Sequence, residues 1–240
     1  MLSILYWGSL ILTPYAFQYI DFYSLYKGLA SVAIGQILTI SYFVTFTKNT
    51  VKYNIVDKIY KHVTQPEGIL LLGAYLIISW EYKLLPSTYY ETRYGVIWKD
   101  VWLQLACQDF LQYVIHRIEH VSIIYKQTHG YHHIHVRPIM FDAFDGSFSD
   151  TIAMIIIPLI ITSNVVHTNT YSYIMFGTMY SSMLTLIHSE YDHPWEFAFR
   201  KIGFGTSYEH QIHHKYFKYN YGHIFMYWDH IFGTYYENNN

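Results

Sequence analysis

Stretches of hydrophobic residues long enough to cross a lipid bilayer alternate with short polar segments along this chain. They lie at about residues 2–19, 29–46, 68–80, 101–115, 151–162 and 171–187. A membrane helix needs about 20 predominantly apolar residues, and several of these stretches approach that length. The last two are joined by polar residues 163–170 and are predicted to form a hairpin. The pattern predicts an all-α, polytopic membrane protein with a transmembrane helical core.

The first stretch contains Pro14, which predicts a kinked membrane helix rather than a break. No basic segment precedes this stretch, so we expect a membrane anchor rather than a cleaved signal peptide.

The orientation of the chain follows from its positive charges. Lys48, Lys52, Lys58 and Lys61 lie between the second and third stretches. The positive-inside rule places such a loop in the cytosol. Counting spans from this loop returns the chain to the cytosolic face near His116 and again near residue 188. All the histidine clusters are therefore expected on the cytosolic side of the membrane.

Composition supports a lipid environment. Hydrophobic residues make up 52% of the chain and charged residues only 13%, about half the share in a soluble domain. The net charge of −2 offers no basic surface for nucleic acid. Cys107 is the single cysteine, which excludes an internal disulfide and predicts a small packing residue. The 15 histidines need an explanation, because every imidazole ring carries a donor and an acceptor.

Most of these histidines fall into four clusters. The clusters are His116–His120 (HxxxH), His129–His133 (HxxHH), His188–His193 and His210–His214 (HxxHH). Spacings of three and four place rings on one helix face. Random placement predicts roughly 0.06 HxxHH motifs in such a chain, so two copies indicate a function. The isolated His62, His167 and His223 are predicted to be ordinary surface or packing residues.

Such clusters are typical of metal sites. Imidazole binds iron, zinc, copper and nickel, so the rings alone do not identify the metal. Eight or nine rings are too many for one ion and suit two. Acids beside the clusters could orient the rings by accepting their other N–H groups, or could equally be solvated surface charges; they are Glu119, Glu190, Asp192 and Glu209. Asp109 is expected to support a ligand, with packing against Arg117 as the alternative.

Linked motifs in residues 109–234 resemble the fatty acid hydroxylase and sterol desaturase superfamily. The resemblance begins at Asp109-Phe110-Leu111-Gln112-Tyr113-Val114-Ile115-His116-Arg117 and continues through the first HxxHH to Pro138. The segment from His188 to Trp195 resembles the 4-methyl sterol oxidase and cholesterol 25-hydroxylase branch. The end of the chain matches through Glu209-His210-Gln211-Ile212-His213-His214, Asn220-Tyr221-Gly222 and Trp228-Asp229-His230-Ile231-Phe232-Gly233-Thr234.

The resemblance implies a four-helix membrane core and a cytosolic helical cap that holds two iron ions. The ligands it implies are His116, His120, His129, His132, His133, His188, His210, His213 and His214, with His193 as a tenth. His230 is expected to be structural, and His135 to support the site from outside the ligand set. We expect residues 1–100 to form N-terminal spans and residues 101–240 the catalytic region, within a single integrated domain.

The implied activity is O2-dependent oxidation of an unactivated C–H bond in a sterol or related lipid. The segment from Tyr191 to Trp195 favours a 4-methyl sterol. Desaturation and fatty acid or sphingoid hydroxylation share the ligands and stay open. Electrons are expected from NAD(P)H through cytochrome b5 or a similar carrier in trans, because the chain has no His-Pro-Gly-Gly haem motif. The endoplasmic reticulum is the expected location.

Two other classes compete with this interpretation. A membrane metal transporter would carry polar ligands in the middle of its spans, whereas these stretches are nearly free of histidine and acid. A catalytically dead scaffold would have lost a ligand, and none is missing from the motifs. The sequence therefore favours the oxidase.

Overall fold

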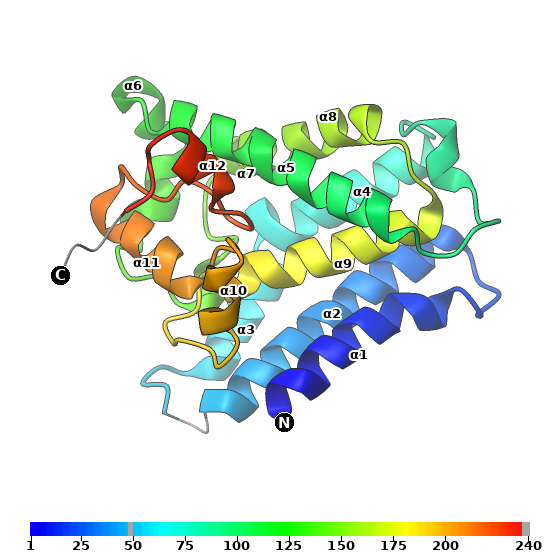
Figure 1. Cartoon of the computed structure of the whole chain (residues 1–240), viewed down its shortest axis with the longest axis horizontal. Helices are drawn as coiled ribbons and strands as arrows, with labels where there is room; N and C mark the ends of the chain where they lie inside the picture. Colours follow the sequence, from blue (N-terminus) through cyan, green and yellow to red (C-terminus); the bar gives the residue numbers. More distant parts are fainter. Residues whose placement is uncertain (48–49, 237–240) are drawn as a thin grey trace.

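The computed structural model describes residues 1–47 and 50–236 as a bundle of helices with a smaller helical region at one end (Figure 1). The α-helices are α1 (Leu2–Phe17), α2 (Ser24–Thr47), α3 (Ile55–Thr64), α4 (Leu71–Glu81), α5 (Trp98–Glu119), α6 (Ser122–Tyr125), α7 (Phe148–Thr151), α8 (Ile157–Val165), α9 (Thr170–Leu186), α10 (Glu196–Lys201), α11 (Ser207–Tyr216) and α12 (Tyr227–Ile231). Short π-helices are η1 (Pro66–Leu70) and η5 (Ile152–Ile156), and short 3₁₀-helices are η2 (Ser87–Tyr90), η3 (His129–Ile134) and η4 (Met140–Asp142).

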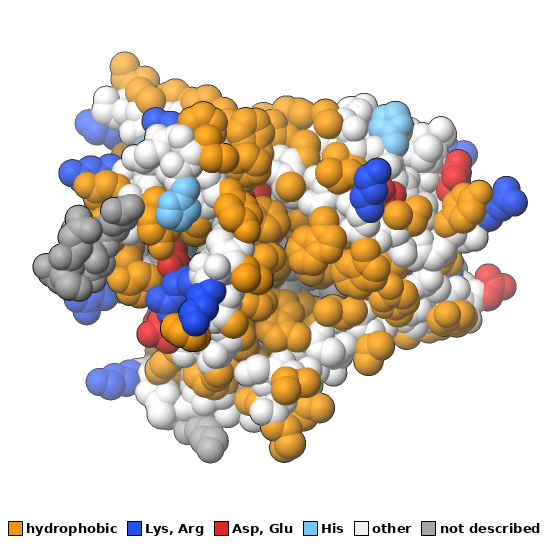
Figure 2. All heavy atoms as spheres, viewed as in Figure 1, with side chains coloured by type: hydrophobic (Ala, Val, Ile, Leu, Met, Phe, Trp, Pro, Cys, Tyr) orange, Lys and Arg blue, Asp and Glu red, His pale blue; other side chains and the backbone are white. Residues whose placement is uncertain are grey.

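Three continuous helices are long and apolar enough to cross a membrane. They are α2, the run α3–η1–α4 (Ile55–Glu81) and the run α7–η5–α8 (Phe148–Val165), while α1 is a shorter apolar helix. Figure 2 shows hydrophobic side chains across the middle of one face, with most charged side chains toward its two ends. The predicted all-α membrane fold is confirmed. Lys48, which contributed to the predicted orientation, lies outside the described residues.

The stretches at 101–115 and 171–187, which were predicted to be membrane spans, form helices that are not among the three candidate spans. The first lies in α5, which is not among the helices apolar enough to cross a membrane and carries Lys99, Asp100 and Asp109. The second is α9, a helix in which almost every residue is buried and which packs against α1, α2 and α5. Inside the bundle, the Ser31 and Thr178 hydroxyls are 2.9 Å apart. Small polar residues of this kind join helices in an apolar environment.

The helical region at one end, which we call the cap, contains α6, η3, η4, α10, α11 and α12 (Figure 1). The C-terminal ends of α5 and α9 both point to the cap (Figure 1); His116 lies in the last turn of α5, and His188 lies in the turn after α9. Thr206 and Glu209 form a capping box that begins α11, and Phe217 ends it with a left-handed φ of 63°. The cap therefore receives histidines from helices far apart in the sequence.

The run α3–η1–α4 is kinked at Gly68. Its φ of −105° and ψ of −111° lie outside the helical region, and Pro66 begins the η1 segment. A Cβ atom at Gly68 would lie only 2.6 Å from the Phe144 Cβ. The kink therefore depends on a residue without a side chain, and it brings this helix against the segment that carries Phe144.

Candidate metal centre

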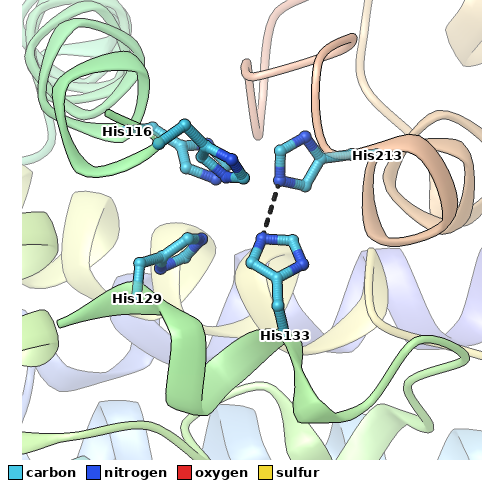
Figure 3. A group of neighbouring side chains, drawn as sticks. His116, His129, His133 and His213 are labelled. Carbon is cyan, nitrogen blue, oxygen red and sulfur yellow. Dashed lines mark hydrogen bonds between the residues drawn. The ribbon is translucent and has the colours of Figure 1, made fainter. Parts of the chain in front are cut away.

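Nine histidines meet in the cap as two groups. The first histidine group contains His116, His120, His129, His133 and His213, and the second contains His132, His188, His210 and His214. Within each group, one ring nitrogen per residue lies within 4.8 Å of all the others. The rings come from α5, η3, the turn after α9, and α11. Figure 3 shows four rings of the first group turned toward a common centre.

Backbone carbonyls fix the orientation of most of these rings. Five Nδ1 atoms lie 2.8–3.1 Å from a carbonyl oxygen; the pairs are His116 with Tyr221, His132 with Asp145, His188 with Leu184, His213 with Tyr219 and His214 with His135. A carbonyl only accepts hydrogen bonds, so each of these Nδ1 atoms carries the proton and donates it. In a neutral ring the Nε2 atom is then a bare lone pair, as a metal ligand requires.

In the second histidine group the Nε2 atoms converge, and those of His132, His188 and His214 are among these lone pairs. The His188 Nε2 lies 3.2 Å from the His132 Nε2 and 2.9 Å from the His210 Nε2, and the His214 Nε2 lies 3.1 Å from the His210 Nε2. Two lone pairs that face each other repel unless a cation lies between them. Nitrogens bound at 2.0–2.1 Å to one ion are separated by about 2.9 Å at right angles and about 3.4 Å in a tetrahedron. The observed spacing fits a shared metal ion.

The first histidine group leads to the same conclusion. The Nε2 atoms of His133 and His213 are 3.1 Å apart. The Nε2 atoms of His116, His120 and His129 are buried and have no hydrogen-bond partner among the described residues. Buried polar atoms without partners are rare in native proteins and call for an explanation such as an ion. The donor set therefore fits a second metal ion.

Eight of the nine rings have a pKa below the usual 6.5 and are neutral at physiological pH. Burial, and after it the neighbouring histidines, lower the pKa of His120 to about 3 and that of His132 to about 4. Burial also holds the pKa values of His133, His213 and His214 below the usual 6.5. Metal binding requires unprotonated imidazole, so the site is ready for cations at pH 7.

A carboxylate holds the ring of His129. Its Nδ1 lies 2.8 Å from an Asp150 oxygen and 4.0 Å from a Glu119 oxygen. Burial, and after it the charge of Asp150, raise the pKa of Glu119 to about 8. The pair therefore carries one negative charge near pH 7, on Asp150. The predicted support from Glu119 is accordingly weaker than that from Asp150, which sequence reasoning missed. The only sequence signal for Asp150 is its position three residues after Ser147, whose side chain caps the start of α7.

The Asp109 carboxylate does not contact a ligand ring. Its carboxylate accepts the backbone N–H groups of His223, Ile224 and Phe225 at 2.7–3.2 Å and the Trp228 indole N–H at 3.0 Å. The residue thus holds the turn beside Tyr221, whose carbonyl orients His116. Its predicted support of the site acts through the backbone.

Three other predicted acids make no contact with the histidine groups. Glu190 accepts from the Tyr53 hydroxyl at 2.7 Å and from the Met140 N–H at 3.2 Å. Asp192 is exposed. Glu209 caps α11 through Thr206. Of the two alternatives left open for these acids, the structure does not show the support of ligand rings, because the side chains point to a helix end, to a neighbouring loop or to solvent.

His193 lies away from both histidine groups, contrary to the predicted tenth ligand. Its ring stacks on Trp195 with centroids 4.7 Å apart, and its Nδ1 lies 3.3 Å from the Tyr42 hydroxyl. The α9 helix ends at Leu186, so the five-residue spacing from His188 does not follow a helical turn.

His223, unlike His193, lies close to both histidine groups. It was predicted to be ordinary packing, yet it is buried with its ring 5.0 Å from that of His116 and 5.4 Å from that of His210.

The remaining histidines lie outside the two groups. His62 is buried against the Phe141 carbonyl, and His167 is exposed. His230 stacks on Tyr235 with centroids 4.0 Å apart. His135 pairs with Asp145 at 3.0 Å, and its own carbonyl orients His214.

A cavity of about 40 Å³ adjoins the two histidine groups. Its lining contains the rings of His129, His132, His188 and His223, the polar side chains of Gln112, Asp150 and Thr151, and apolar side chains that include Phe144, Met154, Ile155 and Leu184. A small molecule in this cavity would touch both histidine rings and hydrocarbon.

Comparison with known proteins agrees with this class of site. The sequence model of the fatty acid hydroxylase family matches residues 101–234, and the chain belongs to this family. The chain is also similar to a protein of the diatom Phaeodactylum tricornutum named alternative squalene epoxidase, with 42% identity over 192 residues. The match covers 73% of this chain and 55% of that protein, so the chain spans about half the length of this relative. No solved structure matches the chain. The family and the relative are both named for oxidation of lipids.

Proposed function

We propose that the chain is an O2-dependent, di-iron oxidase that epoxidises a linear polyene such as squalene. The observation that carries the proposal is the convergence of Nε2 lone pairs, with Nδ1 protons held by carbonyls, in two adjacent groups. Two ions bound there would supply O2 activation and the redox change, which side chains cannot provide. Iron is favoured because the fatty acid hydroxylase family is typically iron-dependent.

The choice of a polyene rests on the relative and on the cavity. The relative's name states squalene epoxidation, and several apolar side chains line the cavity beside the rings. The reaction balances as alkene plus O2, two electrons and two protons, giving epoxide and water. One oxygen atom joins the two alkene carbons, and the other leaves as water.

The chain's own residues prepare the site for this reaction. The five carbonyls and Asp150 hold six rings in one tautomer and direction, so binding needs little reorganisation. The apolar side chains of Met154, Ile155 and Leu184 exclude water from the space beside the rings. Exclusion of water protects a reactive oxidant from side reactions.

Oxidation of a 4-methyl sterol is the second candidate. It rests on the likeness of residues 188–195 to the sterol oxidase branch. The aromatic members of this segment pack elsewhere, however: the Trp195 ring lies 4.9 Å from that of Tyr42 and 6.0 Å from that of Tyr6. Because Tyr191 and Trp195 do not line the cavity, this segment gives weaker support for a substrate than the cavity wall does.

Electron supply and location belong to the same proposal. The carrier would be cytochrome b5 or a similar protein that uses NAD(P)H, acting at the cap. Basic residues such as Lys126, Arg137, Lys215 and Lys218 belong to cap segments, which favours a cytosolic cap by the positive-inside rule. The endoplasmic reticulum is the proposed membrane. Transport of metal is disfavoured because both groups lie at one end of the bundle.

Expression in yeast whose own squalene epoxidase is repressed tests the function. The wild-type chain should convert accumulated squalene to 2,3-epoxysqualene, His188→Ala should not, and the exposed His167→Ala should behave as wild type. A second strain with its 4-methyl sterol oxidase repressed tests the alternative. Clearance of 4-methyl sterols with unchanged squalene would replace the polyene by the sterol, and no histidine-dependent change in either strain would contradict the oxidase.

A further inference from the structure

A second, larger cavity lies inside the helical bundle. It measures about 100 Å³ and lies between α2, α4 and α9, with walls formed mainly by apolar side chains such as Leu29, Val32, Leu76 and Phe176. An apolar cavity of about 150 Å³ stays dry and accepts benzene, so this space suits a slim hydrocarbon rather than a polar group.

The bundle cavity lies next to the metal site. Phe144 and Ile155 line both this cavity and the one beside the histidines. Ser24 and Trp80 are shared with a wide surface pocket that also contains Glu81 and Lys83. The three spaces are therefore neighbours in the order surface pocket, apolar bundle cavity and metal-side cavity, and the shared side chains separate them.

The combined length of these spaces follows from α9 and the turn after it. Tyr173 and Tyr180 line the bundle cavity, and His188 lines the metal-side cavity. At 1.5 Å per residue, the 15 steps from Tyr173 to His188 span about 22 Å. This length is most of the roughly 30 Å hydrocarbon thickness of a bilayer. A long, extended chain that lay along these spaces would point end-on at the metals.

Departures from regular α-helix surround the passage between the two cavities. Ile155 belongs to the π-helix η5, and Phe144 packs against the non-helical Gly68 in η1. Such π-helical segments occur mostly at functional sites. The irregular backbone at Ile155, and at Gly68 beside Phe144, supports a role for this passage in selecting what reaches the metals.

We propose that the bundle cavity is the substrate channel, that it takes a linear hydrocarbon end-on, and that Phe144 and Ile155 admit only the chain terminus to the metals. This inference rests on the proposed oxidase function and names its substrate class. It assigns the reaction to a terminal unit of the chain rather than to a methyl group on a ring.

Two glycines allow a matched test. A Cβ atom at Gly177, on the channel wall, would lie 3.7 Å from Val32 Cγ2, whereas a Cβ atom at Gly73 would meet nothing within 4 Å. Gly177→Leu should therefore fill the channel, and Gly73→Leu should leave it open. The probe is a linear isoprenoid hydrocarbon with a photoreactive diazirine at one end, applied to the purified, metal-loaded full chain in detergent micelles.

Mass spectrometry of the labelled peptides gives the decisive result. Wild type and Gly73→Leu should be labelled on channel residues of α2 and α9 and near Phe144, and Gly177→Leu should lose that labelling by at least about tenfold while keeping its metal. Labelling of wild type elsewhere, or equal labelling of both variants, would overturn the channel. Channel labelling without any oxidised product would instead contradict the proposed function and leave the channel standing, whereas product without channel labelling would do the reverse.

Discussion

Removal of Asp150 should weaken metal binding by a predictable amount. Its carboxylate accepts the His129 Nδ1–H at 2.8 Å. A hydrogen bond to a charged group contributes about 1.5–3 kcal/mol, which corresponds to about 10- to 150-fold in affinity. Loss of a residue that orients a metal-bound histidine costs about 10- to 100-fold, which agrees with that range.

Glu119 should soften the effect of Asp150→Ala. Its oxygen lies 4.0 Å from the His129 Nδ1, and the charge of Asp150 helps to raise its pKa to about 8. Without Asp150, the Glu119 carboxyl ionises more readily and can accept part of the lost hydrogen bond. The single variant should therefore lose about tenfold, and the double variant Glu119→Gln/Asp150→Ala about 100-fold.

The assay is metal retention by the purified protein in buffers of fixed free iron(II) under anaerobic conditions. Asp145→Ala is the matched control, because its side chain pairs with His135 and Lys61 while its backbone carbonyl still orients His132. A partly exposed ion pair contributes at most about 1 kcal/mol, so the control should stay within about fivefold of wild type. Wild-type retention by the double variant, or an equal loss in the control, would refute the reasoning.

Three further predictions follow from the site. His193→Gln should keep wild-type metal content by elemental analysis, since its ring stacks on Trp195; loss of an ion would return it to the ligand set. Asp109→Ala should lower unfolding free energy by about 3–5 kcal/mol in denaturant titrations, because four buried donors lose their acceptor, and a change under 1 kcal/mol would contradict this. Burial lowers the pKa of His132 to about 4 and that of His120 to about 3, whereas in the unfolded chain a histidine has a pKa of about 6.5. The metal-free protein should therefore be most stable above pH 6.5 and lose stability steadily as the pH falls toward 3. A thermal unfolding temperature that does not change from pH 7.5 to 5 would contradict this.

The sequence predicted the helical membrane fold and nine of the histidines that meet, but not their division into two groups. Adjacent histidines in each HxxHH join different groups: His133 and His213 belong to the first, His132 and His214 to the second. Neighbouring residues on an α-helix point about 100° apart, and those on a 3₁₀-helix about 120° apart. Each HxxHH motif can therefore reach both metal positions. Which histidine joins which group is determined only by the packing of η3 against α11.

Tertiary contacts explain the residues that pattern reasoning misjudged. His223 has no periodic neighbour, and the turn that carries it is held by Asp109, which lies more than 100 residues earlier. Asp150 reaches His129 across 21 residues. Five ligand rings depend on backbone carbonyls, which every residue has and no motif marks. The α5 helix failed as a membrane span because charged residues lie within it.

Metal stoichiometry tests the central claim most directly. The full chain, expressed with iron and purified in detergent, should contain two iron ions. His213→Ala, in the first histidine group, and His188→Ala, in the second, should each reduce the content toward one, while the exposed His167→Ala keeps both. A content of one or none in folded wild type, or an unchanged content in both ligand variants, would contradict a two-metal centre built from these histidines.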